Sequence, residues 1–136
     1  MPSVTYRPVG ARIVAYGSSV ALVVVTIVIG VALPSDITFT VAELITLALT
    51  LGAMLAVLHG IGRSYVRADD AGLEILNGYR RHQIVWDRMK GISMNTGAPW
   101  PTLVLKDDDR VLLFAIQGSD GDAARAAVDD LVRRIP

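Results

Sequence analysis

Two long apolar segments near the N-terminus decide what this chain can fold into. The first, 13–33, contains no charged residue, and the second, 41–61, carries only Glu43 and His59, one near each end. A helix rises about 1.5 Å per residue, so each segment would be about 31 Å long and would match the roughly 30 Å hydrocarbon core of a bilayer. The sequence therefore predicts a transmembrane helical hairpin.

The boundaries of the two segments carry helix signals. Pro34 follows the first segment, while Thr40 and Glu43 fit the T-x-x-E capping box at the start of the second. Glu43 is therefore interpreted as a helix cap rather than an ion ligand. His59 is interpreted as an interfacial residue near a helix C-terminus rather than a haem or proton-relay ligand.

Basic residues flank the hairpin and indicate its orientation. Arg7 and Arg12 precede the first segment, Arg63 and Arg67 follow the second, and the connecting loop has none. The positive-inside rule then predicts that both termini, including the tail 1–12, lie in the cytoplasm. The first segment is long for the h-region of a signal peptide, so we expect an uncleaved anchor in a multi-pass protein.

Small residues recur every four positions down the second segment and would form one stripe on a helix: Ala48, Gly52, Ala56 and Gly60. Such a stripe lets another helix approach closely. The partner is either the first helix, through Gly17 and Ala21, or a helix of a different protein. A second copy of the chain is a further alternative.

From residue 62 the pattern changes to short candidate strands separated by turn signals: 65–68, 73–76, 80–86, 92–95, 102–106 and 110–115. Asn77-Gly78 favours a type I′ hairpin turn. Residues 121–135 keep the apolar spacing of an amphipathic helix. The range 62–136 is therefore predicted to be a small antiparallel sheet whose open side is covered by a C-terminal helix.

Three stretches within this chain resemble a known family: 66–73, of the form V-R-A-D-x-x-G-[LV]; 85–92, like V-x-W-[DE]-x-[IV]-x-x-[IV]; and the run from Pro99-Trp100 through 103–107 to 115–117 and Asp120. They are similar to small actinobacterial membrane proteins with two N-terminal transmembrane helices and a bacterial pleckstrin-homology (PH) like domain. The resemblance implies an α+β fold, an antiparallel β-sandwich with a C-terminal helix. It carries over no catalytic residues.

The chain departs from the family pattern at two places. Met89 stands where the family prefers a β-branched residue. The turn 107–109 consists of three aspartates and lacks the usual glycine, which leaves its exact hairpin type open. Three adjacent aspartates are interpreted as a turn rather than a calcium site, because calcium needs six or more oxygens from a spaced loop.

The residue inventory argues against catalysis. The absence of cysteine excludes disulfides, thiolate catalysis and cysteine metal sites, and 13 basic residues balance 13 acidic ones, which gives no reason to expect nucleic-acid binding. We find no nucleophile–base pair, no phosphate-binding glycine loop and no cluster of metal ligands. We therefore expect a non-enzymatic protein without a cofactor or metal.

Two groups of residues are candidates for contact with a partner or with lipid. Arg80, Arg81 and Lys90 could meet anionic lipid or form a solvated face. Trp100, between two prolines, could anchor a partner or fold back over the edge of the sandwich. Trp86 is interpreted as a core residue.

We therefore expect an accessory or scaffolding subunit of a larger inner-membrane complex, of which a respiratory-chain complex is one example. Its partners would be other membrane-protein subunits and the lipid bilayer of the bacterial cytoplasmic membrane. The alternative is a membrane-surface module that contacts anionic lipids or associates with itself as a homodimer.

Overall fold

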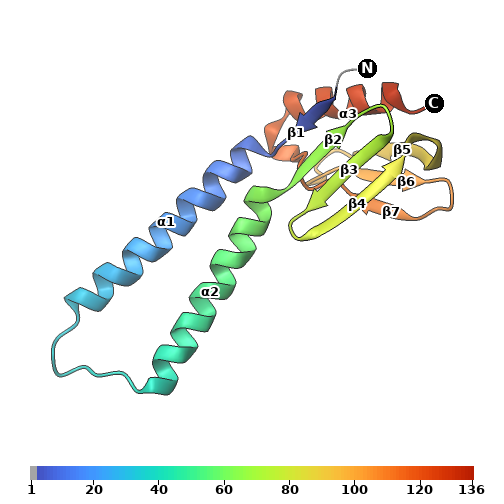
Figure 1. Ribbon diagram of the computed structural model, residues 1–136. Helices are drawn as coiled ribbons and strands as arrows, with labels where there is room; N and C mark the ends of the chain where they lie inside the picture. The colour runs from blue at the N-terminus through green and yellow to red at the C-terminus, as the bar shows by residue number, and fades with distance from the viewer. Residues whose placement is uncertain (1–2) are drawn as a thin grey trace.

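Two long helices extend from one end of a small domain in the computed structural model, which describes residues 3–136 (Figure 1). The helices are α1 (Val9–Ala32) and α2 (Val41–Arg63), and they lie side by side. They start and end within a few residues of the predicted segments. Thr40 and Glu43 form the predicted capping box, with Thr40 N donating to Glu43 Oε2 at 2.8 Å and Glu43 N to Thr40 Oγ1 at 3.2 Å.

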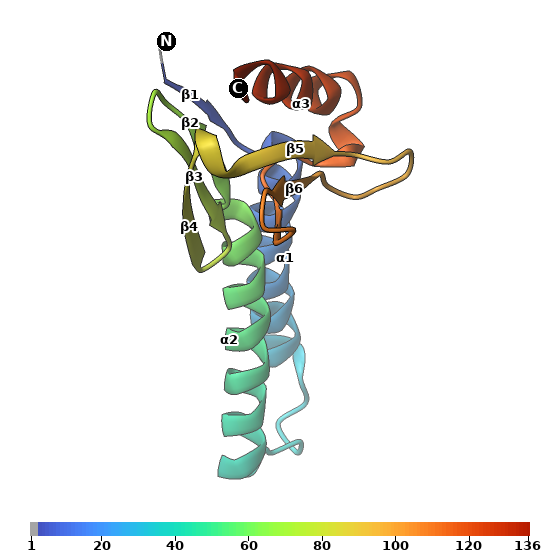
Figure 2. The same ribbon diagram turned by 90° about the vertical axis from the view of Figure 1, so that its right-hand side faces the viewer.

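The rest of the chain forms what we term the sheet domain, made of seven strands, two short 3₁₀ helices and one α-helix: β1 (Val4–Tyr6), β2 (Tyr65–Ala68), β3 (Gly72–Asn77), β4 (Arg80–Val85), η1 (Trp86–Arg88), β5 (Met89–Ser93), β6 (Thr102–Leu105), β7 (Arg110–Leu112), η2 (Gly118–Asp120) and α3 (Asp122–Arg134). The strands form two antiparallel sheets, ordered β1-β2-β3-β4 and β5-β6-β7. Helix α3 lies across the end of the molecule opposite the α1–α2 loop (Figure 2).

One apolar core holds the two sheets and α3 together. Its fully buried side chains come from both sheets and from α3, for example Val66, Ile75, Leu103 and Leu131, each 0% exposed. The predicted architecture of a helical hairpin followed by an antiparallel sheet with a covering C-terminal helix is confirmed. The buried apolar side chains alternate along β2 and β6, because successive residues of a strand point to opposite faces.

The apolar side chains of α1 and α2 are mostly exposed. Ala15 is the one buried residue of α1, and Gly60 and Gly62 are those of α2, within the part of the chain that the structure describes. By length and composition both helices are able to cross a membrane. A bilayer would cover this apolar surface, which the sheet domain leaves uncovered.

The N-terminal segment is part of the sheet domain, where the sequence had indicated only a tail. β1 pairs with β2 in antiparallel register, with Val4 opposite Ala68 and Tyr6 opposite Val66. The Tyr6 hydroxyl also donates a hydrogen bond to the Asp130 carboxylate on α3. The chain therefore enters α1 from the sheet domain and returns to it from α2. A strand of three residues is too short to produce a recognisable alternation in sequence.

Removing the Tyr6 hydroxyl should lower stability and flatten its pH dependence. Burial and the Asp130 hydrogen bond raise the pKa of Tyr6 to about 12, and the same bond lowers the pKa of Asp130. The contribution of Tyr6 to the free energy of unfolding is complete below pH 10.0. It is lost as the pH rises through the raised pKa and the phenol ionises in the folded state. The contribution of Asp130 to the free energy of unfolding is present above the ordinary pKa of an aspartate. It is lost as the pH falls through the lowered pKa that Asp130 has in the folded state.

We expect Tyr6→Phe to cost about 1 kcal/mol near neutral pH. Denaturation measured across the pH range should show a shallower loss of stability at both extremes than in the unaltered protein. An unchanged profile would show that the Tyr6–Asp130 contact contributes nothing in solution.

The turn between β3 and β4 differs from the predicted type I′ turn at Asn77-Gly78. Asn77 pairs with Arg80, so the two central residues are Gly78 and Tyr79. Gly78 has φ +65°, whereas Tyr79 has a negative φ. A positive φ at the first central position alone is the pattern of a type II′ turn, which explains the glycine there. The shift places Tyr79 at the tip of the hairpin.

The three aspartates at 107–109 form the predicted turn between β6 and β7. Asp108 N donates to Leu105 O at 3.0 Å, and Leu105 N donates to Asp109 O at 2.8 Å. Asp108 itself has φ +67°, which is uncommon for a residue other than glycine but tolerated by aspartate. Asp108 therefore takes the conformation that the missing glycine would supply.

Candidate functional site

The tip of the β3–β4 hairpin is docked on the end of α2. Ser64, 1% exposed, donates through Oγ to Gly60 O at 3.0 Å and accepts from Gly78 N at 2.9 Å. The hydroxyl of Tyr79 donates to Ala56 O at 2.5 Å. A Cβ at Gly60 would lie only 2.9 Å from the Tyr79 ring, so a glycine at this position leaves the space that the ring occupies. These contacts fix the sheet domain to the hairpin, in addition to the two places where the chain connects them.

Aromatic and basic side chains gather around this junction. The Tyr16 hydroxyl lies 3.2 Å from His59 Nδ1, and the rings of His59 and Tyr79 have centroids 6.4 Å apart. The guanidinium carbon of Arg63 lies 5.2 Å from the centre of the Tyr79 ring, a cation–π contact. Tyrosine and arginine at the end of an apolar helix are typical of a membrane interface. His59 takes part in this packing and in no group of metal ligands among residues 3–136.

The small-residue stripe on α2 is divided between two environments. Ala48, Gly52 and Ala56 are exposed, and a Cβ at Gly52 would meet no described atom within 4 Å. Gly60 is buried, but against Tyr79 rather than against a helix. Of the alternatives for the stripe, packing against α1 does not occur at Ala48, Gly52 and Ala56.

A different face of α2 meets α1. Between residues 41 and 59 the half-buried positions of α2 are Leu51, Leu55 and Leu58, which repeat with helical spacing. A Cβ at Gly17 of α1 would also meet no described atom within 4 Å, so close helix approach does not occur at the predicted position. The half-buried leucines indicate the face of α2 that meets α1, and the stripe lies on another face.

The predicted basic group does not form one patch. Arg81 pairs with Glu74 at 3.5 Å, and Lys90 pairs with Asp108 at 3.6 Å on the other sheet. Arg80 is exposed, makes no ion pair among the described residues, and follows Tyr79 at the docked hairpin tip. Of the three, Arg80 is the residue best placed to reach a membrane surface. Sequence spacing missed the pairing because the acidic partners come from β3 and from the β6–β7 turn.

Trp100 folds back onto the sheet domain. Its ring packs edge-on against Phe114, with the ring centroids 4.6 Å apart, and it is half-buried. Trp86 is also half-buried and packs against the core, and its Nε1 donates to Asp69 O at 2.8 Å. Of the two alternatives for Trp100, the structure favours a supporting role at the edge of the sandwich.

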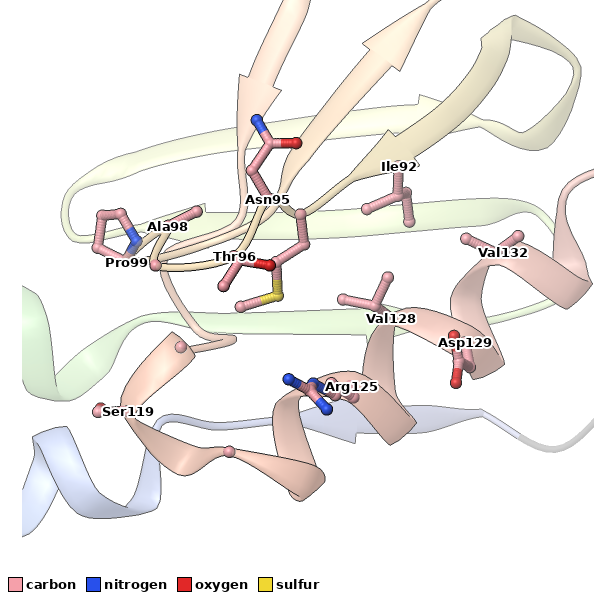
Figure 3. Close-up of a pocket in the computed structure, with 14 residues that line it drawn as sticks. Ile92, Asn95, Thr96, Ala98, Pro99, Ser119, Arg125, Val128, Asp129 and Val132 are labelled. Carbon is pink, nitrogen blue, oxygen red and sulfur yellow. The ribbon is translucent and has the colours of Figure 1, made fainter.

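A groove of about 630 Å³ lies between β5 and α3 (Figure 3). Its apolar walls are formed by Ile92 and Met94 on one side and by Val128 and Val132 on the other. The loop that follows β5 closes one end, where Arg125 of α3 also lies. Sequence reasoning missed this groove, because it depends on how α3 sits beside β5 and no motif marks it.

Comparison with known proteins identifies the sheet domain. Residues 63–134 match a family model described as bacterial PH domain. Curated relatives from two strains of Mycobacterium tuberculosis and from Mycobacterium bovis, each described as an uncharacterized protein, are 29% identical over 133 residues. The alignment covers 93% of this chain and 84% of each relative. No solved structure matches the chain.

Proposed function

The chain belongs to the bacterial PH domain family, and we propose that it is a non-enzymatic accessory or scaffolding subunit of a larger complex in the cytoplasmic membrane. A bacterial PH-like domain is joined to two helices that are able to cross a membrane. That combination fits a membrane-associated module. The subunit role, the host complex and the cytoplasmic position of both termini belong to the proposal.

The docking of the sheet domain on the hairpin carries this proposal. Gly78 and Tyr79 contact Ser64 and Ala56, and β1 leads directly into α1. An independent domain on a flexible linker would leave the two parts free to move. Here the hairpin and the sheet domain form one body, so a partner could contact both without first ordering them.

The outward-facing stripe supports a membrane partner. Ala48, Gly52 and Ala56 are exposed and unused by α1, so a helix of another subunit could approach there closely. A respiratory-chain complex is one host with membrane helices of this kind. A second copy of the chain is the alternative occupant.

We expect Gly52→Ile to abolish co-purification of the partner while the protein still folds. Because a Cβ at Gly52 meets nothing within 4 Å among the described residues, the larger side chain fits the isolated hairpin and blocks only an approaching helix. Affinity purification in mild detergent measures the loss. The matched control is Thr50→Ile, which lies about 200° around the helix from Gly52 and should leave association unchanged. Equal recovery with both variants would contradict a partner at the stripe.

A second candidate function is contact with anionic lipid at the docked hairpin tip. Arg80 follows Tyr79, and Arg63 stacks on Tyr79, so two guanidinium groups lie near the domain end of α2. A basic residue at an anionic membrane surface contributes about 1 kcal/mol, or about fivefold in affinity. This candidate rests on Arg80, because Arg81 and Lys90 of the predicted basic group form ion pairs with Glu74 and Asp108.

Lipid retention separates this candidate from the first. In nanodiscs of mixed phosphatidylcholine and phosphatidylglycerol, the extracted protein should retain excess phosphatidylglycerol, and Arg80→Gln should reduce the excess about fivefold. The matched control is Arg110→Gln, on β7 of the other sheet. Retention at the bulk lipid ratio, or an equal loss in both variants, would count against a lipid role for the hairpin tip.

A further inference from the structure

We propose that the groove between β5 and α3 binds an extended segment of a partner polypeptide, which adds as a strand to the free edge of β5. The inference rests on the proposed function for the existence of a partner, and it identifies where the sheet domain holds that partner. Its occupant is defined by chemistry: an extended backbone, alternating apolar side chains and one acidic side chain.

The backbone of β5 supplies the first requirement. The second sheet has the order β5-β6-β7, so β5 pairs with β6 on one side alone. Among the described residues no backbone hydrogen bond from another segment reaches the outer edge of β5. An edge of this kind is a template for an added strand, because its unpaired N–H and C=O groups can form a ladder of hydrogen bonds with an extended backbone.

A bulge limits which part of the edge is usable. The register between β5 and β6 shifts between Met89 and Gly91, and Lys90 lies at the irregularity. Bulges and lysines protect sheet edges from unwanted pairing. The regular edge therefore runs from Gly91 to Ser93, where β5 ends, and its length of about 10 Å is enough to pair with about three residues of a peptide strand.

The walls of the groove supply the second requirement. Ile92 of β5 and Met94, which directly follows the end of that strand, are two residues apart, and both are half-buried. They line the groove together with Val128 and Val132, which lie one turn apart on α3, and Val132 is 42% exposed. Figure 3 shows Ile92 across the groove from Val128 and Val132. A strand laid along β5 would turn every second side chain into this apolar channel, which explains why an alternating sequence fits.

Gly91 leaves room for a close backbone approach. Its φ is not positive, and a Cβ there would meet no described atom within 4 Å, so neither turn geometry nor packing in this chain requires glycine. Glycine inside a strand is destabilising by about 0.5–1 kcal/mol relative to alanine. Glycine in a strand often marks a bulge or a place where another backbone comes close. Gly91 lies at the bulge, and the open space beside it would admit a second backbone.

The charges of the groove define the third requirement. Arg125 and Asp129 line it, and neither forms an ion pair among the described residues, whereas the neighbouring Asp130 pairs with Arg133 and Arg134. Arg125 lies at the end that the loop after β5 closes (Figure 3). An acidic side chain of the partner at this end would meet an unpaired guanidinium group.

The experiment uses the full chain in nanodiscs and a displayed library of random 12-residue peptides as the probe. Selected peptides should alternate apolar and polar residues and carry an acidic residue toward one end. Val132→Asp should weaken their binding at least tenfold, and Arg125→Glu should weaken it and favour peptides with a basic residue instead. The matched control is Ala126→Asp, which adds the same charge to α3 at an exposed position outside the groove.

Hydrogen exchange identifies the binding mode. A peptide that adds as a strand should slow exchange of backbone amides within 91–93, because they gain hydrogen-bond partners. No enrichment over empty nanodiscs, binding that survives Val132→Asp, or bound peptides that leave these amides unprotected would overturn the proposal. The last result would indicate a ligand that fills the groove without pairing to β5.

The outcomes separate this inference from the proposed function. If a partner co-purifies equally with the unaltered protein and with Val132→Asp, the subunit role stands and the groove is not where the partner binds. If peptides bind as described but no partner co-purifies from the native membrane, the groove inference stands and the subunit role fails.

Discussion

Gly72→Ala should strongly destabilise the sheet domain, with an expected loss of about 3–5 kcal/mol in the free energy of unfolding. Gly72 begins β3 opposite Val85 and has φ +157°. A Cβ there would lie 2.0 Å from Ile84 O and 2.8 Å from Val85 Cα, both backbone atoms of the paired strand. Because the hydrogen bonds between β3 and β4 hold these atoms in place, the clash could be relieved only if the two strands separated. A small domain has only about 5–15 kcal/mol of total stability.

Denaturation in mild detergent, followed by the fluorescence of Trp86 and Trp100, measures this loss. The matched control is Gly91→Ala, also within a strand, where a Cβ has open space and the φ is not positive. The control should be neutral or slightly stabilising. If both variants were equally stable, the close approach of β4 to Gly72 would be wrong.

Ser64→Ala should cost about 2 kcal/mol and loosen the sheet domain from the hairpin. The hydroxyl of Ser64 bridges Gly60 O and Gly78 N in a buried position. Removing it leaves the Gly78 N–H without its partner, and an unsatisfied buried donor costs more than an exposed one. Tyr79 would then hold the hairpin tip alone.

Spin labels on the exposed residues Leu49 and Leu112 would report the loosening as a broader distribution of distances between hairpin and sheet domain. Ser119→Ala is the matched control, because Ser119 is exposed and makes no side-chain hydrogen bond that involves a described residue. A narrow, unchanged distribution in Ser64→Ala would show that the junction is held by the chain connections alone.

Local patterns were sufficient to predict the three α-helices and the strands from β2 onward. Apolar length predicted α1 and α2, the Thr40–Glu43 box predicted where α2 begins, and the apolar repeat predicted α3. Each of these signals lies within one segment of the chain, so no tertiary information was needed. The family resemblance then predicted how the strands are arranged, and the family match confirms it.

Features that depend on distant segments were not predictable in the same way. β1 pairs with a strand about 60 residues later, and its three residues carry no alternation of their own. The pairing of Arg81 with Glu74 and of Lys90 with Asp108 depends on strand register and turn geometry. The groove beside β5 could not be predicted because it depends on the position of α3. The exposure of Gly52 could not be predicted because it depends on which face of α2 meets α1.

The most direct test of the subunit role is purification of the unaltered chain from its native membrane in mild detergent by a C-terminal tag. The account predicts that other integral membrane subunits are recovered with it in fixed stoichiometry. Mass spectrometry and quantification of the recovered subunits would identify the complex. Recovery of the chain alone, or only with further copies of itself, would contradict the proposal and favour lipid contact or self-association.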